Sequence, residues 1–305
     1  MTAKLSDLET MACSGLGAAT SVLFTNPFEV AKNRLQMDSE LSAGKRAYRG
    51  MLDCMTKTWE VEGLRGVQRG LELSVLRDGS KCFFRLGLFE PILRRMHPDE
   101  ENLRKAPLWK QLIAGGTSGL VAAVLCNSLD LAKVRIQSAG ALSASHHEIA
   151  GLSTPAVLRK IFAEEGASAL IKGLPVNAAR SITFTSVVMT TNARAKQALA
   201  GAGVRDGFVR DAAGSFMASC IGIIVLNPLD VLRTRIYNQP SAPGRELYAG
   251  TLDAAAKIAR AEGISGFYKG LFAHFCRVGP HTVLTFVFMG EFKRALLASK
   301  RSSTV

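Results

Sequence analysis

Three charged residues recur at the same spacing in three parts of this 305-residue chain. In each copy a carboxylate is followed three residues later by a base, and two residues after that by a second base. The three copies of this acid–base set are Glu29-Lys32-Arg34, Asp130-Lys133-Arg135 and Asp230-Arg233-Arg235. An acid and a base three residues apart share one face of a helix, so each set can form ion pairs within its helix or with a neighbouring helix.

The energy of such pairs depends on where they form. Within one solvated helix a pair contributes about 0.2–0.5 kcal/mol. Between helices, a buried pair has a Coulomb energy of about 4 kcal/mol at 4 Å and an effective dielectric constant of 20, less the cost of desolvating both charges. Solvated helix ends with ordinary pairs are the simpler interpretation, but that interpretation does not explain why the set is triplicated.

A second group of cations also follows the repeat. Arginines lie seven residues after three glycines that open predicted helices, and two further bases follow the first arginine at helical spacing; the five are Arg77, Lys81, Arg85, Arg180 and Arg277. At a bilayer centre five such cations facing lipid would cost about 15 kcal/mol, so we expect them to line water. A ring of three guanidinium groups, each able to bind a carboxylate bidentately, favours a small dianion. The alternative is that these arginines are structural partners of carboxylates such as Asp78 or Glu72.

The spacing of the acids indicates the architecture. They lie 101 and 100 residues apart, which predicts three tandem repeats, placed at 1–102, 103–203 and 204–298, with a mobile tail at 299–305. Each repeat reads as long helix, loop, short helix and second long helix, and strands have no clear candidate. The predicted fold class is therefore all-α, with six long helices in one body of pseudo-threefold symmetry. The predicted helices are 10–36, 51–61, 71–96, 108–137, 155–164, 174 to about 199, 208–237, 251–261 and 271 to about 297.

One position departs from the repeat. Pro27 and Pro228 lie near the ends of the first long helices of repeats one and three, where proline removes a backbone donor and kinks the helix. Repeat two has Ser128 at this position, and serine can bend a helix but keeps the donor. We therefore expect the corresponding helix of repeat two to be straighter.

The composition favours helices in a membrane. Hydrophobic residues make up 48% and the mean hydropathy is +0.15, values that suit helices with one apolar side and one side lining a polar cavity. The net charge of +13 admits nucleic acid, an anionic membrane surface or an anionic substrate. Nucleic-acid binding would favour a basic stripe with exposed aromatic residues, whereas the bases here follow the repeat, so we expect no nucleic-acid partner.

Other classes of site are not indicated. The six cysteines form no CxxC and no metal-ligand spacing, so we expect reduced packing residues and no metal. No catalytic triad or Walker loop is recognisable, which predicts that the protein is not an enzyme. The first ten residues have no arginine-rich amphipathic pattern, so targeting would have to be internal.

Two patterns are repeated along the chain. One is the triplicated P-x-[DE]-x-x-[KR]-x-[KR]. The other is an acid-Gly pair that is followed, seven residues later, by a glycine preceded by Arg or Lys. In these two patterns the chain resembles the mitochondrial carrier family. The resemblance covers essentially the whole chain and implies a multi-pass transporter of the mitochondrial inner membrane whose cavity opens alternately to the two sides. Within the family, RVGPHTVLTFVF at 277–288 is similar to oxoglutarate/malate carriers. RLGLFEP at 85–91 and TRIYNQP at 234–240 are similar to oxaloacetate carriers.

The resemblance assigns roles to the charged residues. It implies that Glu29 pairs with Lys133, Asp130 with Arg233 and Asp230 with Lys32, closing the matrix end as a gate, with Gln36, Gln137 and Tyr237 as braces. The implied substrate-binding residues are Arg77, Lys81, Arg85, Arg180, Ser181, Arg277 and His281, and the pair Arg180-Ser181 goes with keto acids and dicarboxylates. The implied cytosolic gate is incomplete and should close weakly; it retains Glu90, Arg94, Glu291 and Arg294.

Two groups near these arginines could carry a proton. Asp78 beside Arg77 is unfavourable for anion binding alone and could carry a coupled proton. His281 lies one turn after Arg277, and histidine's ordinary pKa of about 6.5 would suit proton-linked transport. A hydrogen-bonded residue lining the cavity is the alternative for His281.

The amino ends of the helices suggest a lipid. Exposed backbone donors at a helix amino end bind phosphate, so a doubly anionic lipid could dock beside the glycines Gly50, Gly70, Gly151, Gly173, Gly250 and Gly270. By resemblance this lipid is cardiolipin; ordinary turn glycines are the alternative. We expect no other cofactor.

The expected function is exchange of small dicarboxylates or keto acids, such as oxoglutarate, malate or oxaloacetate, by a monomer. A proton-leak or inorganic-anion carrier of the uncoupling type is one alternative. A non-transporting membrane scaffold or a soluble helical repeat protein is another. The three intact arginines argue against a scaffold, and the lengths of the helices argue against a soluble solenoid.

Overall fold

The computed structural model describes residues 6–38, 40, 47–97, 106–139, 152, 154–166, 171–204, 208–239 and 247–302. Within these residues the chain forms ten helices and no strand, which confirms the all-α fold class. The helices are α1 (Asp7–Met37), α2 (Met51–Val67), α3 (Leu71–Met96), α4 (Leu108–Leu125), α5 (Asn127–Ser138), α6 (Thr154–Glu165), α7 (Leu174–Gly201), α8 (Phe208–Asn238), α9 (Thr251–Gly266) and α10 (Leu271–Ser302).

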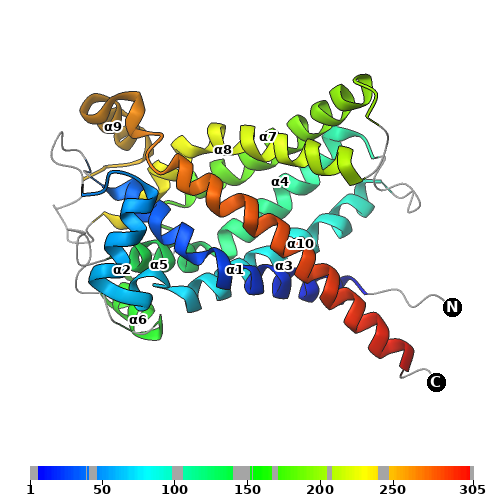
Figure 1. The fold of residues 1–305 in the computed structure, drawn as a ribbon, viewed down its shortest axis with the longest axis horizontal. Coiled ribbons are helices and arrows are strands. Elements are labelled where there is room, and N and C mark those ends of the chain that lie inside the picture. The colour runs from blue at the N-terminus through cyan, green and yellow to red at the C-terminus, as the bar shows by residue number, and fades with distance from the viewer. Residues whose placement is uncertain are drawn as a thin grey trace.

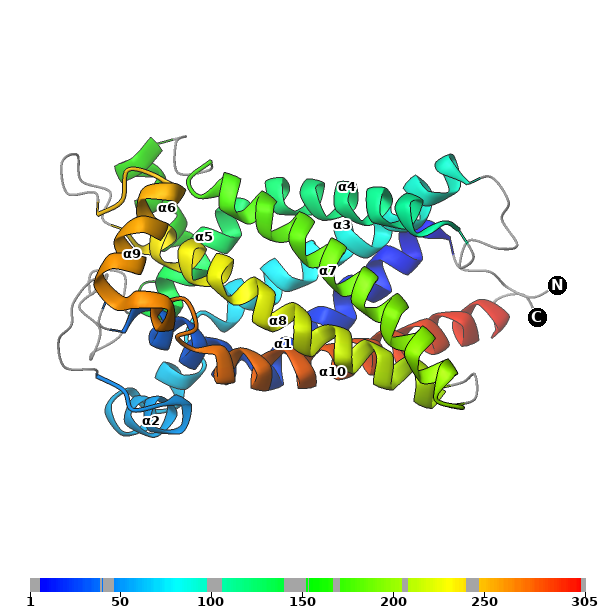
Figure 2. The same ribbon diagram turned by 90° about the horizontal axis from the view of Figure 1, so that it is seen from above.

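The long helices form a closed ring. Around it, α1 packs on α3, α3 on α4, α4 on α7, α7 on α8, α8 on α10, and α10 returns to α1. The short helices α2, α6 and α9 gather at one end of the molecule, and both chain termini lie at the other end (Figures 1 and 2). Each repeat thus contributes two long helices to the ring and one short helix to the same end.

Local sequence explains where α1 begins and how closely it packs. Ser6 and Glu9 form a capping box, in which the Glu9 amide donates to Ser6 Oγ and the Ser6 amide donates to Glu9 Oε2, so the helix starts at Asp7 rather than near residue 10. Further along, a Cβ on Gly17 would lie 2.9 Å from the Thr285 carbonyl oxygen of α10. The small residues of α1 therefore let the neighbouring helix backbones approach closely.

The expectation that the helix holding Ser128 is straighter stays a prediction, and this helix has a break that the sequence did not announce. α1 and α8 run through Pro27 and Pro228 without interruption, whereas the first long helix of repeat two is divided into α4 and α5 at Cys126, whose φ and ψ are −99° and 7°. The break precedes Asn127, whose side chain donates to the Lys172 carbonyl and accepts from the Tyr237 hydroxyl. The helix of repeat two is therefore interrupted next to a residue that contacts two neighbouring segments, at a position without proline.

Glycines mark the ends of the short helices. Gly63 within α2 and Gly263 within α9 have φ of +64° and +68°, so the regular helix stops where the sequence predicts. Gly173 has φ +65° and precedes α7; a Cβ there would lie 2.4 Å from the Tyr237 ring.

The boundary at the C-terminus differs from the prediction, because α10 continues to Ser302, and Lys300 on its last turns lies 2.7 Å from Glu9.

The outer surface of the ring is apolar. Large side chains such as Phe24, Ile113, Phe216 and Phe286 are exposed on the long helices. Two described helical segments, Leu108–Leu125 and Ala213–Asn238, are long and apolar enough to cross a membrane by composition alone. The other long helices combine an apolar outer face with the charged residues described next, which lowers their mean hydropathy.

Candidate functional site

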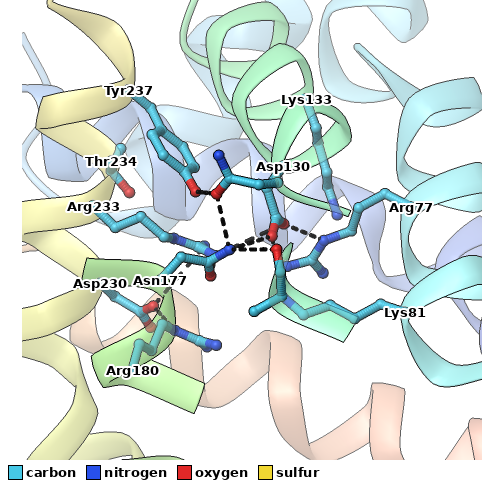
Figure 3. A network of polar contacts seen from close by, with 12 residues as sticks. Arg77, Lys81, Asp130, Lys133, Asn177, Arg180, Asp230, Arg233, Thr234 and Tyr237 are labelled. Atoms are coloured by element: carbon cyan, nitrogen blue, oxygen red, sulfur yellow. Dashed lines mark hydrogen bonds and ion pairs between the residues drawn. The ribbon is translucent and has the colours of Figure 1, made fainter. Parts of the chain in front are cut away.

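The carboxylates Glu29 of α1, Asp130 of α5 and Asp230 of α8 converge near the end that holds the short helices. We call them the gate acids. Figure 3 shows Asp130 facing Arg77 and Lys81 of α3 and Arg233 of α8. At most about a tenth of each gate acid's side chain is exposed. Carboxylates in such a position require partners, because an unpaired buried charge is strongly destabilising.

All three interhelical contacts implied by the resemblance are present. Lys133 Nζ lies 2.8 Å from Glu29 Oε2, and Lys32 Nζ lies 3.1 Å from Asp230 Oδ2. Arg233 Nη1 is more distant from Asp130 Oδ1, at 3.7 Å. Each contact joins two different repeats, so the three together close a ring. That this ring acts as a gate remains a prediction.

The second base of each acid–base set has a different partner. Arg34 makes two hydrogen bonds of 2.9 and 2.8 Å to Glu62, and Arg235 makes two of 2.6 and 2.8 Å to Glu262. Arg135 pairs with Glu165 through one nitrogen, Nη1. Their Nε atoms donate to carbonyls of the next repeat, as Arg135 does to Tyr237 at 2.7 Å. These arginines therefore fix the short helices and the neighbouring repeat rather than the ring.

Sequence reasoning missed the partners of these arginines. The partners are Glu62, Glu165 and Glu262, the acids of the three acid-Gly pairs. Each also binds the base that precedes the next helix, at 2.9 Å for Arg69, 3.1 Å for Lys172 and 2.7 Å for Lys269. These ion pairs could have been predicted, because an acid-Gly pair and a base-Gly pair recur together in all three repeats.

Two of the three expected braces contact asparagines that sequence reasoning also missed. Gln137 Nε2 donates to Asn26 Oδ1 at 2.9 Å, and the Tyr237 hydroxyl donates to Asn127 Oδ1 at 2.7 Å. Gln36 Oε1 accepts from the Thr234 hydroxyl at 2.7 Å. Tyr237 also lies beneath Arg233, whose guanidinium is 5.7 Å from the ring centre. The asparagine that opens each of NPFEV, NSLDL and NPLDV is the signal in the sequence.

A further layer follows each helix-opening glycine by four residues. These positions hold Ser74, Asn177 and His274, which sequence reasoning did not single out. Ser74 donates to Asn26 at 2.8 Å, and Asn177 donates to Asp130 at 3.1 Å. His274 Nδ1 lies 3.3 Å from Asp230 Oδ2. This layer thus links each second long helix to the first long helix of the same repeat.

The arginines Arg77, Arg180 and Arg277, which we call the contact arginines, reach the same acids. Arg77 Nε lies 2.5 Å from Asp130 Oδ1, and Arg180 pairs with Asp230. Arg277 Nη2 lies 3.4 Å from Glu29 and 3.1 Å from Asp78. In this conformation carboxylates of the protein hold the contact arginines, which agrees with the alternative that these arginines are structural partners of acids. An incoming anion would have to compete with those carboxylates.

The remaining candidates for substrate binding differ in their partners. Lys81 Nζ lies 3.0 Å from Asp130. The Arg85 guanidinium lies 4.3 Å from the ring centre of Phe184 and donates to the Thr185 hydroxyl at 3.4 Å, so its contacts are with uncharged groups. His281 Nδ1 is 3.2 Å from the Thr25 hydroxyl, as expected of a hydrogen-bonded lining residue. Ser181 is buried beside Arg180.

The charges of this region do not cancel. The acids are Glu29, Asp78, Asp130 and Asp230, and the cations are Lys32, Arg77, Lys81, Arg85, Lys133, Arg180, Arg233 and Arg277. Eight cations against four carboxylates leave a formal excess of four positive charges. A cationic region enclosed by low-dielectric walls attracts anions and disfavours cations.

Comparison with known proteins agrees with this geometry. The family model described as mitochondrial carrier protein matches residues 3–100, 104–202 and 204–300. The chain belongs to the mitochondrial carrier family. It is therefore a transporter and not an enzyme, and it is a multi-pass protein of the mitochondrial inner membrane.

Individual carriers resemble it at moderate identity. The mitochondrial substrate carrier family protein ucpA of Dictyostelium discoideum is 32% identical over 92% of this chain and 90% of its own length. The mitochondrial oxaloacetate transport protein of Saccharomyces cerevisiae is 30% identical, covering 94% and 90%. A probable mitochondrial 2-oxoglutarate/malate carrier protein of Dictyostelium discoideum is 32% identical, covering 94% and 89%.

The residues assigned to the cytosolic gate of this carrier do not close the opposite end. Arg94 Nη2 lies 3.6 Å from Glu90 of the same helix, and Arg94 Nη1 lies 3.3 Å from Asp7 of α1. Arg294 lies 2.7 Å from Glu291, three residues away in α10, and both are exposed. Among the described residues at this end, these pairs do not link α3 to α10. At this end the described ion pairs between helices join α1 to its two neighbours, through Arg94–Asp7 and Lys300–Glu9.

Five of the six glycines expected to bind lipid directly precede helices. Gly50 and Gly250 precede α2 and α9, and neither helix start has a side-chain cap. Gly70, Gly173 and Gly270 precede α3, α7 and α10 with φ between +65° and +73°. Gly151 lies outside the described residues. The uncapped amino ends are compatible with an anionic lipid headgroup, which stays a prediction.

Proposed function

We propose that this carrier exchanges small dicarboxylates or keto acids, such as oxoglutarate, malate or oxaloacetate, across the inner membrane as a monomer. The observation that carries the proposal is the convergence of Arg77, Arg180 and Arg277, one from each repeat, on the gate acids within a region of excess positive charge. The names of the yeast oxaloacetate transport protein and of the probable Dictyostelium 2-oxoglutarate/malate carrier point to the same class of anion.

The shared partners explain how binding could drive the conformational change. A carboxylate of the substrate that binds Arg180 competes with Asp230, which also holds Lys32 of repeat one. Substrate binding therefore changes the energy of the ion pairs that hold the repeats together. A ligand shifts a conformational equilibrium only through such a difference in its interaction with the two states. The open state would then expose the substrate to the matrix.

We further propose that cardiolipin binds at the uncapped starts of α2 and α9. The backbone amides of a helix amino end favour phosphate, and the neighbouring glycines leave open space, since a Cβ on Gly50 or Gly250 would meet nothing within 4 Å. Addition of cardiolipin to the delipidated protein should raise its unfolding temperature more than a neutral lipid does. Equal stabilisation by both lipids would rule out a headgroup site.

The substrate class is tested by thermal unfolding of the purified carrier with a panel of metabolites. A ligand that binds the folded state stabilises it, by about 2.7 kcal/mol at a hundred times its dissociation constant. Malate, oxoglutarate or oxaloacetate should raise the unfolding temperature, and ATP or amino acids should not. Stabilisation by ATP or an amino acid without any effect of the dicarboxylates would contradict the proposal, and stabilisation by sulfate or phosphate alone would favour an inorganic-anion carrier.

A further inference from the structure

Asp78 is an acid that the threefold pattern does not contain. It follows the contact arginine of repeat one, and the corresponding positions of repeats two and three hold Ser181 and Val278. Only 5% of its side chain is exposed. A buried carboxylate at one of three equivalent positions breaks the symmetry of the site, and it does so at the depth where substrate is expected.

Cations from all three repeats hold this carboxylate. Arg77 of α3 contacts Asp78 Oδ1, Lys133 Nζ of α5 lies 3.3 Å from Oδ2, and Arg277 Nη2 of α10 lies 3.1 Å from Oδ2. Two of these cations are also partners of Glu29, at 2.8 Å for Lys133 and 3.4 Å for Arg277. Asp78 therefore shares its cations with a gate acid and binds two of the three contact arginines.

A substrate carboxylate at Arg77 and Arg277 would need the donors that Asp78 now occupies. We propose that Asp78 is a tethered counter-anion, which occupies part of the substrate site until a substrate carboxylate displaces it and which limits the charge of the anions that the carrier accepts. This proposal rests on the proposed function and names the residue that sets its charge selectivity. The displaced carboxylate stays within the cavity, because it is fixed to α3 beside Arg77.

The consequence is a repulsion that grows with the charge of the substrate. Coulomb repulsion between Asp78 and a bound anion is proportional to the anion's charge, so it opposes a trianion more than a dianion. Neutralising Asp78 raises the excess charge of the site from four to five and removes the competitor. The Asp78→Asn variant should therefore bind malate about tenfold more tightly, and its preference for malate over citrate should fall about tenfold.

The experiment compares four forms of the full-length carrier in liposomes: wild type, Asp78→Asn, Asp78→Glu and Asp53→Asn. Initial exchange rates are measured with malate and citrate over a range of concentrations, which gives KM and kcat for each anion. Asp53 is a matched control because it is an acid of α2 that pairs with Lys57 on the surface, outside the site. Asp78→Glu keeps the charge and should keep the wild-type ratio of the two KM values.

The expected result is a changed KM ratio in Asp78→Asn and an unchanged ratio in the other variants. A ratio in Asp78→Asn within twofold of wild type, or an equal change in Asp53→Asn, overturns the proposal. If Asp78→Asn does not fold, Asp78→Ser, which carries the residue type of repeat two, is measured in its place under the same criterion.

Failure of the proposed function is distinguishable from failure of this inference. If the wild-type protein exchanges neither malate nor oxoglutarate, the proposed function fails. The inference is then decided by thermal unfolding of the purified proteins with sulfate and citrate. For each protein, the shift in unfolding temperature with citrate is compared with the shift with sulfate. A larger citrate-to-sulfate ratio in Asp78→Asn than in wild type supports a tethered counter-anion. The same ratio in both proteins overturns it.

Discussion

Lys32 Nζ lies 3.1 Å from Asp230 Oδ2, although the two residues are 198 positions apart in the chain. The pair joins the first long helix of repeat one to the first long helix of repeat three and so closes the ring of repeats. Both side chains are at most 5% exposed. Any motion that separates α1 from α8 at this end of the molecule has to break this pair.

Reversing the charges of this pair tests whether it couples the two repeats. Lys32→Asp and Asp230→Lys should each reduce exchange and lower the unfolding temperature, because each leaves buried like charges together. The double variant should recover part of both losses, with a coupling energy of about 0.5–3 kcal/mol. Recovery should be partial, because Asp230 also holds Arg180 and His274. Thermal unfolding and initial exchange rates are measured for all four forms.

The control for that cycle is the surface pair Lys57–Asp53, at 3.0 Å within α2. Reversing both charges there should give a coupling of about 0.5 kcal/mol or less, as is typical of exposed pairs. Strictly additive losses for Lys32→Asp and Asp230→Lys would show that the two residues do not depend on each other.

Arg180→Ala should abolish exchange while the protein stays folded. Arg180 is the contact arginine of repeat two, with 14% of its side chain exposed, and its removal leaves Asp230 with Lys32, Arg233 and His274 as partners. The measurement is uptake of labelled malate, with the unfolding temperature as the check of folding. Arg294→Ala serves as the control, since Arg294 is 78% exposed and pairs only with Glu291 among the described residues. Transport by Arg180→Ala at the wild-type rate would remove Arg180 from the site.

Gly173→Ala should destabilise the carrier by about 2–4 kcal/mol. The glycine has φ +65°, and a Cβ would lie 2.4 Å from the buried ring of Tyr237, so the change adds backbone strain to a steric clash. Gly50→Ala is the matched control, because its backbone is extended and a Cβ there would meet nothing within 4 Å. The readout is thermal unfolding of the purified proteins. Equal stability of the two variants would show that the close approach of α7 to Tyr237 is not required.

Cys54 should resist thiol reagents. It lies in the short helix α2, outside the membrane-spanning helices, and its burial raises the pKa of the thiol to about 11. Because the thiolate is the reactive form and the folded protein keeps the thiol protonated below that pKa, N-ethylmaleimide should not modify Cys54 at pH 7.5 or at pH 9. Mass spectrometry of labelled peptides before and after unfolding measures this. Modification of the folded protein as fast as of the unfolded chain would contradict the packing of α2.

The sequence predicts those features that repetition and local chemistry determine. The helix 71–96 has the predicted bounds because glycine opens it and a polar linker follows it. The partners of Glu29 and Asp230 could be named because the acid–base set occurs three times and resembles that of a known family. A single copy would have left ordinary pairs within one helix as the better interpretation.

The features that sequence reasoning missed depend on packing between distant segments. No proline marks the break at Cys126 in the sequence, and the contacts of the adjacent Asn127 form only in the folded chain, with Lys172 and Tyr237. Asp78 could be recognised as unusual beside Arg77, but its bonds to Lys133 and Arg277 join residues 55 and 199 positions away. The spacing of residues within one helix cannot predict contacts between residues so far apart in the chain.

The most direct test of the account is counter-exchange in liposomes. The purified carrier is reconstituted, the liposomes are loaded with unlabelled oxoglutarate, and uptake of labelled malate is measured against empty liposomes and liposomes loaded with ATP. A site in which arginines of all three repeats bind small dianions predicts rapid uptake with oxoglutarate inside and little uptake otherwise. Equal uptake under the three conditions, or uptake only with ATP inside, would contradict it.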